Sequence, residues 1–228
     1  KKRLNSHKLG NPLLKTLAGL RWLISRGGIV SSSIWEAGGL VYGNEHSQYP
    51  NLQYHFGPLG FDIEDNRIRI LQAFSINVDQ MRPQSRGNIR LNPNNLYGSP
   101  HLRFNYLSNR HDLQEMVEAV NTARELVSQN AFDEFRGAEI KPGPKVITNE
   151  EITKMLRQKV ETAYHPSCTC SMGHDNLSVV DSQFRVHNIN ALRVVDASAM
   201  PRIISGNLNA SIQMMAARAA DYILKKPQ

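Results

Sequence analysis

Apolar side chains recur at every third or fourth position in two long stretches of the chain, which predicts two amphipathic helices. The first runs from Leu13 to Ile24 and is expected to end at Gly27-Gly28. The second is the clearer and runs from Asp112 to Gln129. Its apolar face is formed by Leu113, Met116, Val117, Val120, Ala123 and Val127.

Helix-capping signals predict two further helices. Thr148-Asn149-Glu150-Glu151 has the form of a capping box, so a helix is expected from there through Val160. A final helix is expected from Asn209 to Lys226, with Lys225-Lys226 near its C-terminus and Pro227 beyond it.

The rest of the chain is predicted to form short strands separated by turns. Strands are expected within 34–56, where Gly38-Gly39, Gly43-Asn44 and Tyr49-Pro50-Asn51 act as turn signals. Further strands are expected at Ile68–Phe74, Asn88–Leu91, His101–Tyr106 and Leu192–Val195. Strands with a few long helices inserted, rather than a regular alternation, predict an α+β fold: a mixed or antiparallel sheet with helices on one face.

Composition and charge exclude several classes of protein. The formal charge of +7 comes from 27 basic and 20 acidic residues, but no block of five or six like charges occurs, which argues against a nucleic-acid-binding protein. The sequence contains no run of about 18 apolar residues, which is the pattern that predicts a membrane-spanning helix. Cys168 and Cys170 are no disulfide framework and suit a reducing compartment, so we expect a cytoplasmic location, with peripheral attachment at the inner membrane as an alternative that the positive charge allows.

The segment from Tyr164 to Ile212 carries the candidate chemistry. His165 is suited to general-base catalysis because its ordinary pKa lies near neutral pH. Backbone N–H groups after Asn209 open a helix, and a helix N-terminus is an anion site that suits phosphate, carboxylate or a reduced flavin ring. His165, Cys168, Cys170 and His174 are ligand types of a zinc site, but Cys-x-Cys is not the usual spacing of a zinc knuckle, and we expect no metal.

Several motifs together resemble the glucose–methanol–choline (GMC) oxidoreductase family, most closely its choline-oxidising members. They are Trp35–Gly39, Asn51–Phe56, Met81–Gly87, Phe135–Gly143, Tyr164–Gly173 and Ser205–Asn209. The resemblance implies a substrate-binding domain over residues 1–160, with 1–33 as a connecting region, and a C-terminal segment 161–228 that returns to a Rossmann-like FAD domain and carries the catalytic residues. The family's Gly-x-Gly-x-x-Gly fingerprint is absent from this chain. The remainder of the FAD domain is therefore an expected partner, and a homodimer is a further expectation.

The resemblance also implies roles for individual residues. His165 and Asn207 match the catalytic pair, and Glu36 matches the carboxylate that pairs with a quaternary ammonium. Flavin contacts are implied at Asp196, Ala197, Asn209 and Ala210. Aromatic walls of the substrate site are implied at Tyr164 and at Tyr54 or His55. Read alone, Glu36 beside two glycines is also consistent with a solvated turn, and Asn207 with an N-cap.

The expected activity is the FAD-dependent oxidation of a small primary alcohol, choline-like, to its aldehyde, as in glycine betaine biosynthesis. Two alternatives stay open. One is a non-catalytic fragment that binds a quaternary ammonium ligand. The other is a GMC enzyme for an uncharged alcohol, which Gln72 favours because it stands where some choline-type enzymes have a second active-site histidine.

Overall fold

The computed structural model describes residues 11–33, 35–64 and 67–224. They form two compact units, each considered by itself below. The first comprises the described residues up to Gln80 together with Leu113–Lys159, and the second Met81–Asp112 together with the described residues from Val160 onward. The predicted features at Lys225, Lys226 and Pro227 lie outside the described residues.

The centre of the first unit is a three-stranded antiparallel sheet of β1 (Ala37–Val41), β2 (Leu52–Gly57) and β5 (Ser75–Gln80), with β2 in the middle. Tyr54 in β2 is paired with Gly39 on one side and Val78 on the other. A separate antiparallel hairpin joins β3 (Gly60–Glu64) and β4 (Arg67–Leu71). The predicted class, antiparallel sheet with helical cover, is confirmed.

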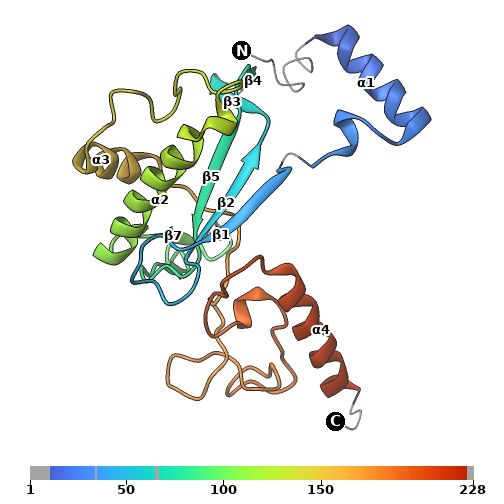
Figure 1. Ribbon diagram of the computed structural model, residues 1–228. Coiled ribbons are helices and arrows are strands. Elements are labelled where there is room, and N and C mark those ends of the chain that lie inside the picture. Colours follow the sequence, from blue (N-terminus) through green and yellow to red (C-terminus); the bar gives the residue numbers. More distant parts are fainter. Residues whose placement is uncertain (1–10, 34, 65–66, 225–228) are drawn as a thin grey trace. The chain divides into compact units, whose positions relative to one another are not determined.

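Helix α2 (Arg110–Ser128) lies along one face of this sheet (Figure 1). Leu52, Tyr54 and Ala119 form the buried cluster at their contact. The Tyr54 hydroxyl donates to the Ala119 carbonyl oxygen at 2.9 Å. Because alanine is small, the helix backbone can approach the tyrosine closely enough for this bond. The apolar side chains around the cluster are Val41, Ile76, Val78 and Ala123.

Polar residues also lie on the buried side of α2. Glu115 is 8% exposed and accepts a hydrogen bond from Asn51 Nδ2 at 2.7 Å and another from the Gln80 amide. Asn51 Oδ1 in turn accepts from the backbone N–H of Gly43 at 2.7 Å. The buried carboxylate is thus hydrogen-bonded, as burial requires, and it ties the loop 43–51 to the helix.

The other predicted helices of the first unit are present. Helix α1 (Pro12–Ser25) begins after Asn11, whose side chain accepts from the N–H groups of Leu13 and Leu14. Helix α3 (Asn149–Lys159) has the predicted capping box. Thr148 Oγ1 accepts from the Glu151 N–H at 3.2 Å, and Glu151 Oε2 accepts from the Thr148 N–H at 2.8 Å.

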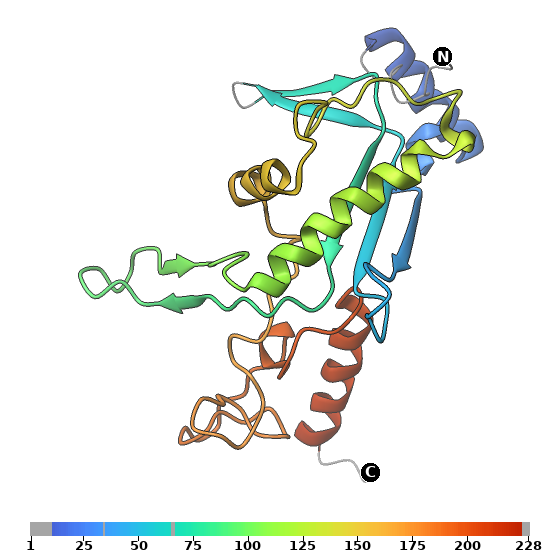
Figure 2. The ribbon, with the colours of Figure 1, turned by 60° about the vertical axis from the view of Figure 1, so that its left-hand side comes forward.

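The second unit contains an antiparallel arm of β6 (Asn88–Arg90) and β7 (His101–Arg103), clear in Figure 2, and the final helix α4 (Asn209–Ile223). One side of α4 packs through Ala219 on a core of Val180, Phe184 and Ala199. The one-turn helix η4 (Ala197–Ala199) contributes the last of these residues.

Two sequence-based expectations about strands were wrong, and two strands were missed. Gly38-Gly39 is not a turn but the middle of β1, where a Cβ on Gly38 would meet the Tyr54 carbonyl oxygen at 2.7 Å, so close strand approach explains the glycine. Strands β3 and β5 were not predicted. Leu192–Val195 is no strand: its backbone makes one isolated bridge, between Arg193 and Arg185, and no continuous ladder extends it.

Candidate active site

The two residues predicted to be catalytic lie together in the second unit. Asn207 Nδ2 is 3.5 Å from His165 Nε2, at the long end of a hydrogen bond. Both side chains are exposed. If the Asn207 amide donates, Nε2 of His165 is the unprotonated ring nitrogen, which is the form a general base needs.

The position of His165 depends on the segment that follows it. The N–H groups of Cys168, Cys170 and Met172 donate to the carbonyl oxygens of successive η4 residues, at 3.2, 2.9 and 3.0 Å. The acceptors are Ala197, Ser198 and Ala199. These three bonds hold the segment 168–172 alongside η4, so two motifs far apart in the sequence are held side by side.

Tyr164 directly precedes His165 and is 79% exposed. Its backbone has a positive φ of 60°, which is uncommon for a bulky residue. Its N–H donates to Thr162 Oγ1 at 3.0 Å. The aromatic ring is therefore open on the surface of this unit next to the His165–Asn207 pair in sequence, and it is available to a ligand.

The N-terminus of α4 follows Asn207 almost directly. Leu208 is the N-cap residue, its side chain makes no capping hydrogen bond, and the first turn of the helix holds no acidic residue. Asn209 and Ala210 are exposed. First-turn N–H groups without a side-chain cap favour an anionic or hydrogen-bond-accepting group, and the acceptor edge of a reduced flavin ring fits this requirement.

Asp196 and Ala197, the other predicted flavin contacts, begin η4. The Asp196 carboxylate accepts from the Ser198 N–H at 2.7 Å and from the Ser198 hydroxyl, so it caps the turn. Asp196 is nevertheless exposed, while Ala197 is half-buried. These residues are brought close to the His165 segment through the Cys168–Ala197 hydrogen bond.

Two predicted substrate residues belong to the first unit, whereas Tyr164 belongs to the second. Glu36 is exposed, its N–H donates to the Phe56 carbonyl oxygen at 3.0 Å, and its carboxylate accepts from the Ser32 hydroxyl. Tyr54 is 5% exposed, and burial raises the pKa of its phenol to about 12, although a hydrogen bond with Thr122 acts the other way. The structure therefore gives Tyr54 a packing role within this unit.

A polar and aromatic cluster on β2 was not singled out as a unit from the sequence. His55 Nε2 lies 3.0 Å from Asp79 Oδ2, and its ring centroid is 6.0 Å from that of Trp35. His55 follows Tyr54 in a strand, so its side chain lies on the sheet face opposite to α2. Of the two alternatives for an aromatic wall, His55 thus has the more open position, because the Tyr54 ring is covered by the helix.

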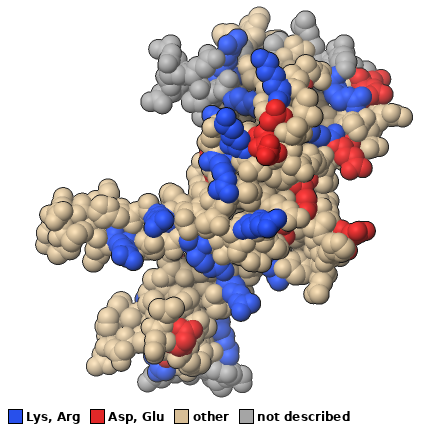
Figure 3. All heavy atoms as spheres, turned by 90° about the vertical axis from the view of Figure 1, so that its left-hand side faces the viewer, with Lys and Arg blue, Asp and Glu red and all other residues tan. Residues whose placement is uncertain are grey.

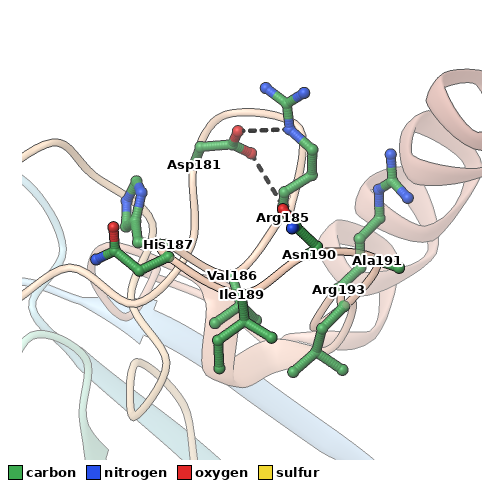
Figure 4. Close-up of a pocket in the computed structure, with 10 residues that line it drawn as sticks. Asp181, Arg185, Val186, His187, Ile189, Asn190, Ala191 and Arg193 are labelled. Atoms are coloured by element: carbon green, nitrogen blue, oxygen red, sulfur yellow. Dashed lines mark hydrogen bonds and ion pairs between the residues drawn. The ribbon is translucent and has the colours of Figure 1, made fainter.

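A pocket of about 430 Å³ in the second unit is lined by residues of the segment 181–193 (Figure 4). In it Asp181 Oδ2 faces Arg185 Nε at 2.7 Å. Burial pushes the pKa of Asp181 up, but hydrogen bonds from the N–H and guanidinium of Arg185 and the N–H of Gln183 outweigh it and lower that pKa. None of the predicted site residues lines this pocket.

The described part of the chain shows no metal-binding cluster and no membrane-spanning helix. In it no group of three or more His, Cys, Asp or Glu side chains could hold a metal ion, and Cys168 and Cys170 are free thiols. Within the same residues no helix is both long and apolar enough to cross a bilayer. Figure 3 shows both basic and acidic side chains on the visible face.

Known proteins resemble this chain in sequence. Residues 83–216 match a family model described as GMC oxidoreductase. Two curated relatives are named oxygen-dependent choline dehydrogenase. That of Serratia proteamaculans (strain 568) is 43% identical over 208 residues, covering 91% of this chain and 38% of the relative. That of Staphylococcus xylosus is 42% identical over 221 residues, covering 95% and 40%. The chain thus spans about two fifths of the length of these relatives.

Solved structures share the fold. Pyridoxine 4-oxidase from Mesorbium loti has a TM-score of 0.74 and 24% identity, covering 86% of this chain and 39% of that chain. An FAD-dependent oxidoreductase from Chaetomium thermophilum has a TM-score of 0.67 and 25% identity, covering 80% and 29%.

Proposed function

Because the chain belongs to the GMC oxidoreductase family, we propose that it supplies the catalytic part of an FAD-dependent enzyme that oxidises a primary alcohol to the aldehyde. The observation that carries this proposal is the 3.5 Å approach of Asn207 to His165, directly before the α4 N-terminus, which lacks a side-chain cap. A base and a hydrogen-bond donor suit the removal of a proton from an alcohol, and an electropositive helix end suits the negative charge of a reduced flavin ring.

In the proposed reaction, His165 Nε2 accepts the proton of the substrate hydroxyl. Asn207 Nδ2 then donates a hydrogen bond to the oxygen, which becomes more negative as the proton leaves. Bound FAD supplies the hydride acceptor. The N–H groups at Asn209 and Ala210 would face the acceptor edge of its ring, and Asp196 and Ala197 would contact it; the helix end stabilises negative charge there. We propose residues 161–228 as the segment that belongs to the flavin domain.

We propose a choline-like quaternary ammonium alcohol as the substrate. Two relatives that share more than two fifths of their aligned residues with this chain are named for choline. Glu36 offers an exposed carboxylate and Tyr164 an exposed ring, the two kinds of group that attract such a cation. The carboxylate is oriented by the Ser32 hydroxyl.

The test is anaerobic stopped-flow reduction of the bound flavin by choline in the full-length enzyme that contains this chain. His165→Ala should slow reduction by about 10²-fold or more, since general-base help is typically worth this much. Flavin content should change little. His187→Ala is the matched control, because the His187 ring bonds the Gly173 carbonyl oxygen at 3.1 Å, a backbone group outside the proposed catalytic pair. A His165→Ala enzyme that keeps its flavin and is reduced at wild-type speed would contradict the proposal.

For location and assembly we propose a cytoplasmic enzyme, homodimeric and able to attach peripherally to anionic lipid. The net charge of +7 supports such attraction. Sedimentation of the full-length enzyme with phosphatidylglycerol vesicles, at low and at high salt, tests the lipid contact. Absence of vesicle binding at low salt would contradict the lipid attachment. A monomer in analytical ultracentrifugation would contradict the homodimer.

A further inference from the structure

We propose that Arg82 is a positioning residue for Asn207, acting through Ser205; this inference rests on the proposed function. Arg82 Nη2 donates to Ser205 Oγ at 3.3 Å across 123 positions of sequence, and both residues belong to the second unit. Ser205 stands two residues before Asn207. The guanidinium therefore holds the short segment from which the Asn207 amide reaches His165.

The loop that carries Arg82 is itself firmly anchored. Asp112 is 1% exposed, and its two carboxylate oxygens accept from the N–H groups of Gln84 and Ser85 at 2.8 and 2.6 Å. Ser85 Oγ also accepts from the Asn109 N–H at 3.1 Å. Met81, directly before Arg82, is 5% exposed. Short charge-assisted bonds from backbone N–H groups to a buried carboxylate fix the chain on one side of Arg82, and a buried side chain fixes it on the other.

Few local contacts position the backbone of the segment 205–207. A Cβ on Gly206 would meet no heavy atom within 4 Å, so no side chain fills the space beside this residue, and glycine adds conformational freedom to the backbone. The α4 N-cap, Leu208, gives no side-chain hydrogen bond to the helix. Ser205 is half-buried while Asn207 is exposed. The bond from Arg82 thus restrains the half-buried end of a segment whose exposed end carries the catalytic amide.

The experiment measures anaerobic flavin reduction in the full-length enzyme for Arg82→Met and Ser205→Ala, each in the wild-type and in the Asn207→Ala background. Each change should slow reduction by about 10-fold in the wild-type background, because misplacing a catalytic group is costly. In the Asn207→Ala background each should cost less than about 2-fold, because a residue that acts through Asn207 has nothing left to position. Arg82→Lys should recover part of the rate, since an ammonium group can still donate.

Arg90→Met is the matched control: it removes the same charge from exposed strand β6 and should leave the rate unchanged. Rates are taken per bound flavin, with the melting temperature recorded, so a variant that merely folds poorly is recognised. Equal slowing in both backgrounds, or a lower melting temperature with an unchanged rate per flavin, would overturn the role of Arg82. If the flavin of the His165→Ala enzyme is reduced at wild-type speed, the proposed function fails instead. Failure of the proposed function and failure of the role of Arg82 are therefore distinguishable.

Discussion

The Asn207 amide lies 3.5 Å from the His165 ring although 42 positions separate the two residues. Three backbone hydrogen bonds between the segment 168–172 and η4 bring them together, because they fix the chain that leaves His165 beside the chain that leads to Asn207. The approach of the two side chains is therefore a property of tertiary structure, and both groups can act on one substrate oxygen.

This geometry leads us to expect non-additive effects of His165→Ala and Asn207→Ala in the full-length enzyme. Each single change should slow flavin reduction, His165→Ala by about 10²-fold or more. The double variant should be slowed by less than the product of the two factors, because each residue depends on the other at the same oxygen. Stopped-flow reduction of all four enzymes gives the coupling. Strictly multiplicative factors would mean that the two side chains work independently.

Glu36→Gln should raise the KM for choline by about 10-fold, the equivalent of 1.4 kcal/mol, and leave the KM for the uncharged analogue 3,3-dimethylbutan-1-ol nearly unchanged. The amide still accepts from Ser32, so the change removes charge more than shape. Glu45→Gln is the control, since Glu45 is a highly exposed carboxylate beside His46. Equal effects on both substrates would show that Glu36 does not contact a cation, and would favour the uncharged-alcohol alternative to which Gln72 points.

Helices with a dense apolar repeat were predictable from local pattern: the expected range 112–129 became α2 at Arg110–Ser128, and the capping box at Thr148 is present. Features that depend on distant partners were not. Gly38 resembles a turn signal locally, yet its role is set by the Tyr54 carbonyl oxygen across the strand pair. Glu115 would be an exposed residue by its chemistry, but Asn51 and Gln80 supply its hydrogen bonds.

In the candidate site, too, some features were predictable from the sequence and others depended on distant partners. The identities of His165 and Asn207 came from motifs, and their roles stay predictions, while their proximity required the fold. Arg82 lies in the motif Met81–Gly87, but that motif gave it no role, because its partner Ser205 is 123 positions away. Tyr54 was predicted as a substrate wall from its motif, but that motif lies in a strand whose alternation turns Tyr54 toward α2 and His55 away from it.

Tyr54→Phe should lower the free energy of unfolding by about 1 kcal/mol, the usual net value of a lost buried hydrogen bond. It removes the donor to the Ala119 carbonyl oxygen and retains the ring that packs on Leu52. The KM for choline should not change. Urea unfolding and steady-state kinetics of the full-length enzyme measure the two quantities, with Tyr97→Phe, at a fully exposed side chain, as control. A raised KM with unchanged stability would restore Tyr54 as a substrate residue.

The capping box of α3 should make the stability of the first unit depend on acid. Backbone hydrogen bonds from Thr148 and Ile147, and then the Thr148 side chain, lower the pKa of Glu151 from its ordinary 4.5. A carboxyl whose pKa is lowered by folding contributes stability that is present above its unfolded pKa and is lost as the pH falls through the folded pKa.

Glu151→Ala should therefore destabilise the protein at pH 7, and the difference in stability from wild type should shrink as the pH falls below 4.5. Glu150→Ala is the control, because Glu150 is in the same first turn and shares any helix-dipole effect. Urea unfolding at a series of pH values measures both, and a Glu151→Ala deficit that stays constant down to strongly acidic pH would show that the ionised carboxylate is not what caps the helix.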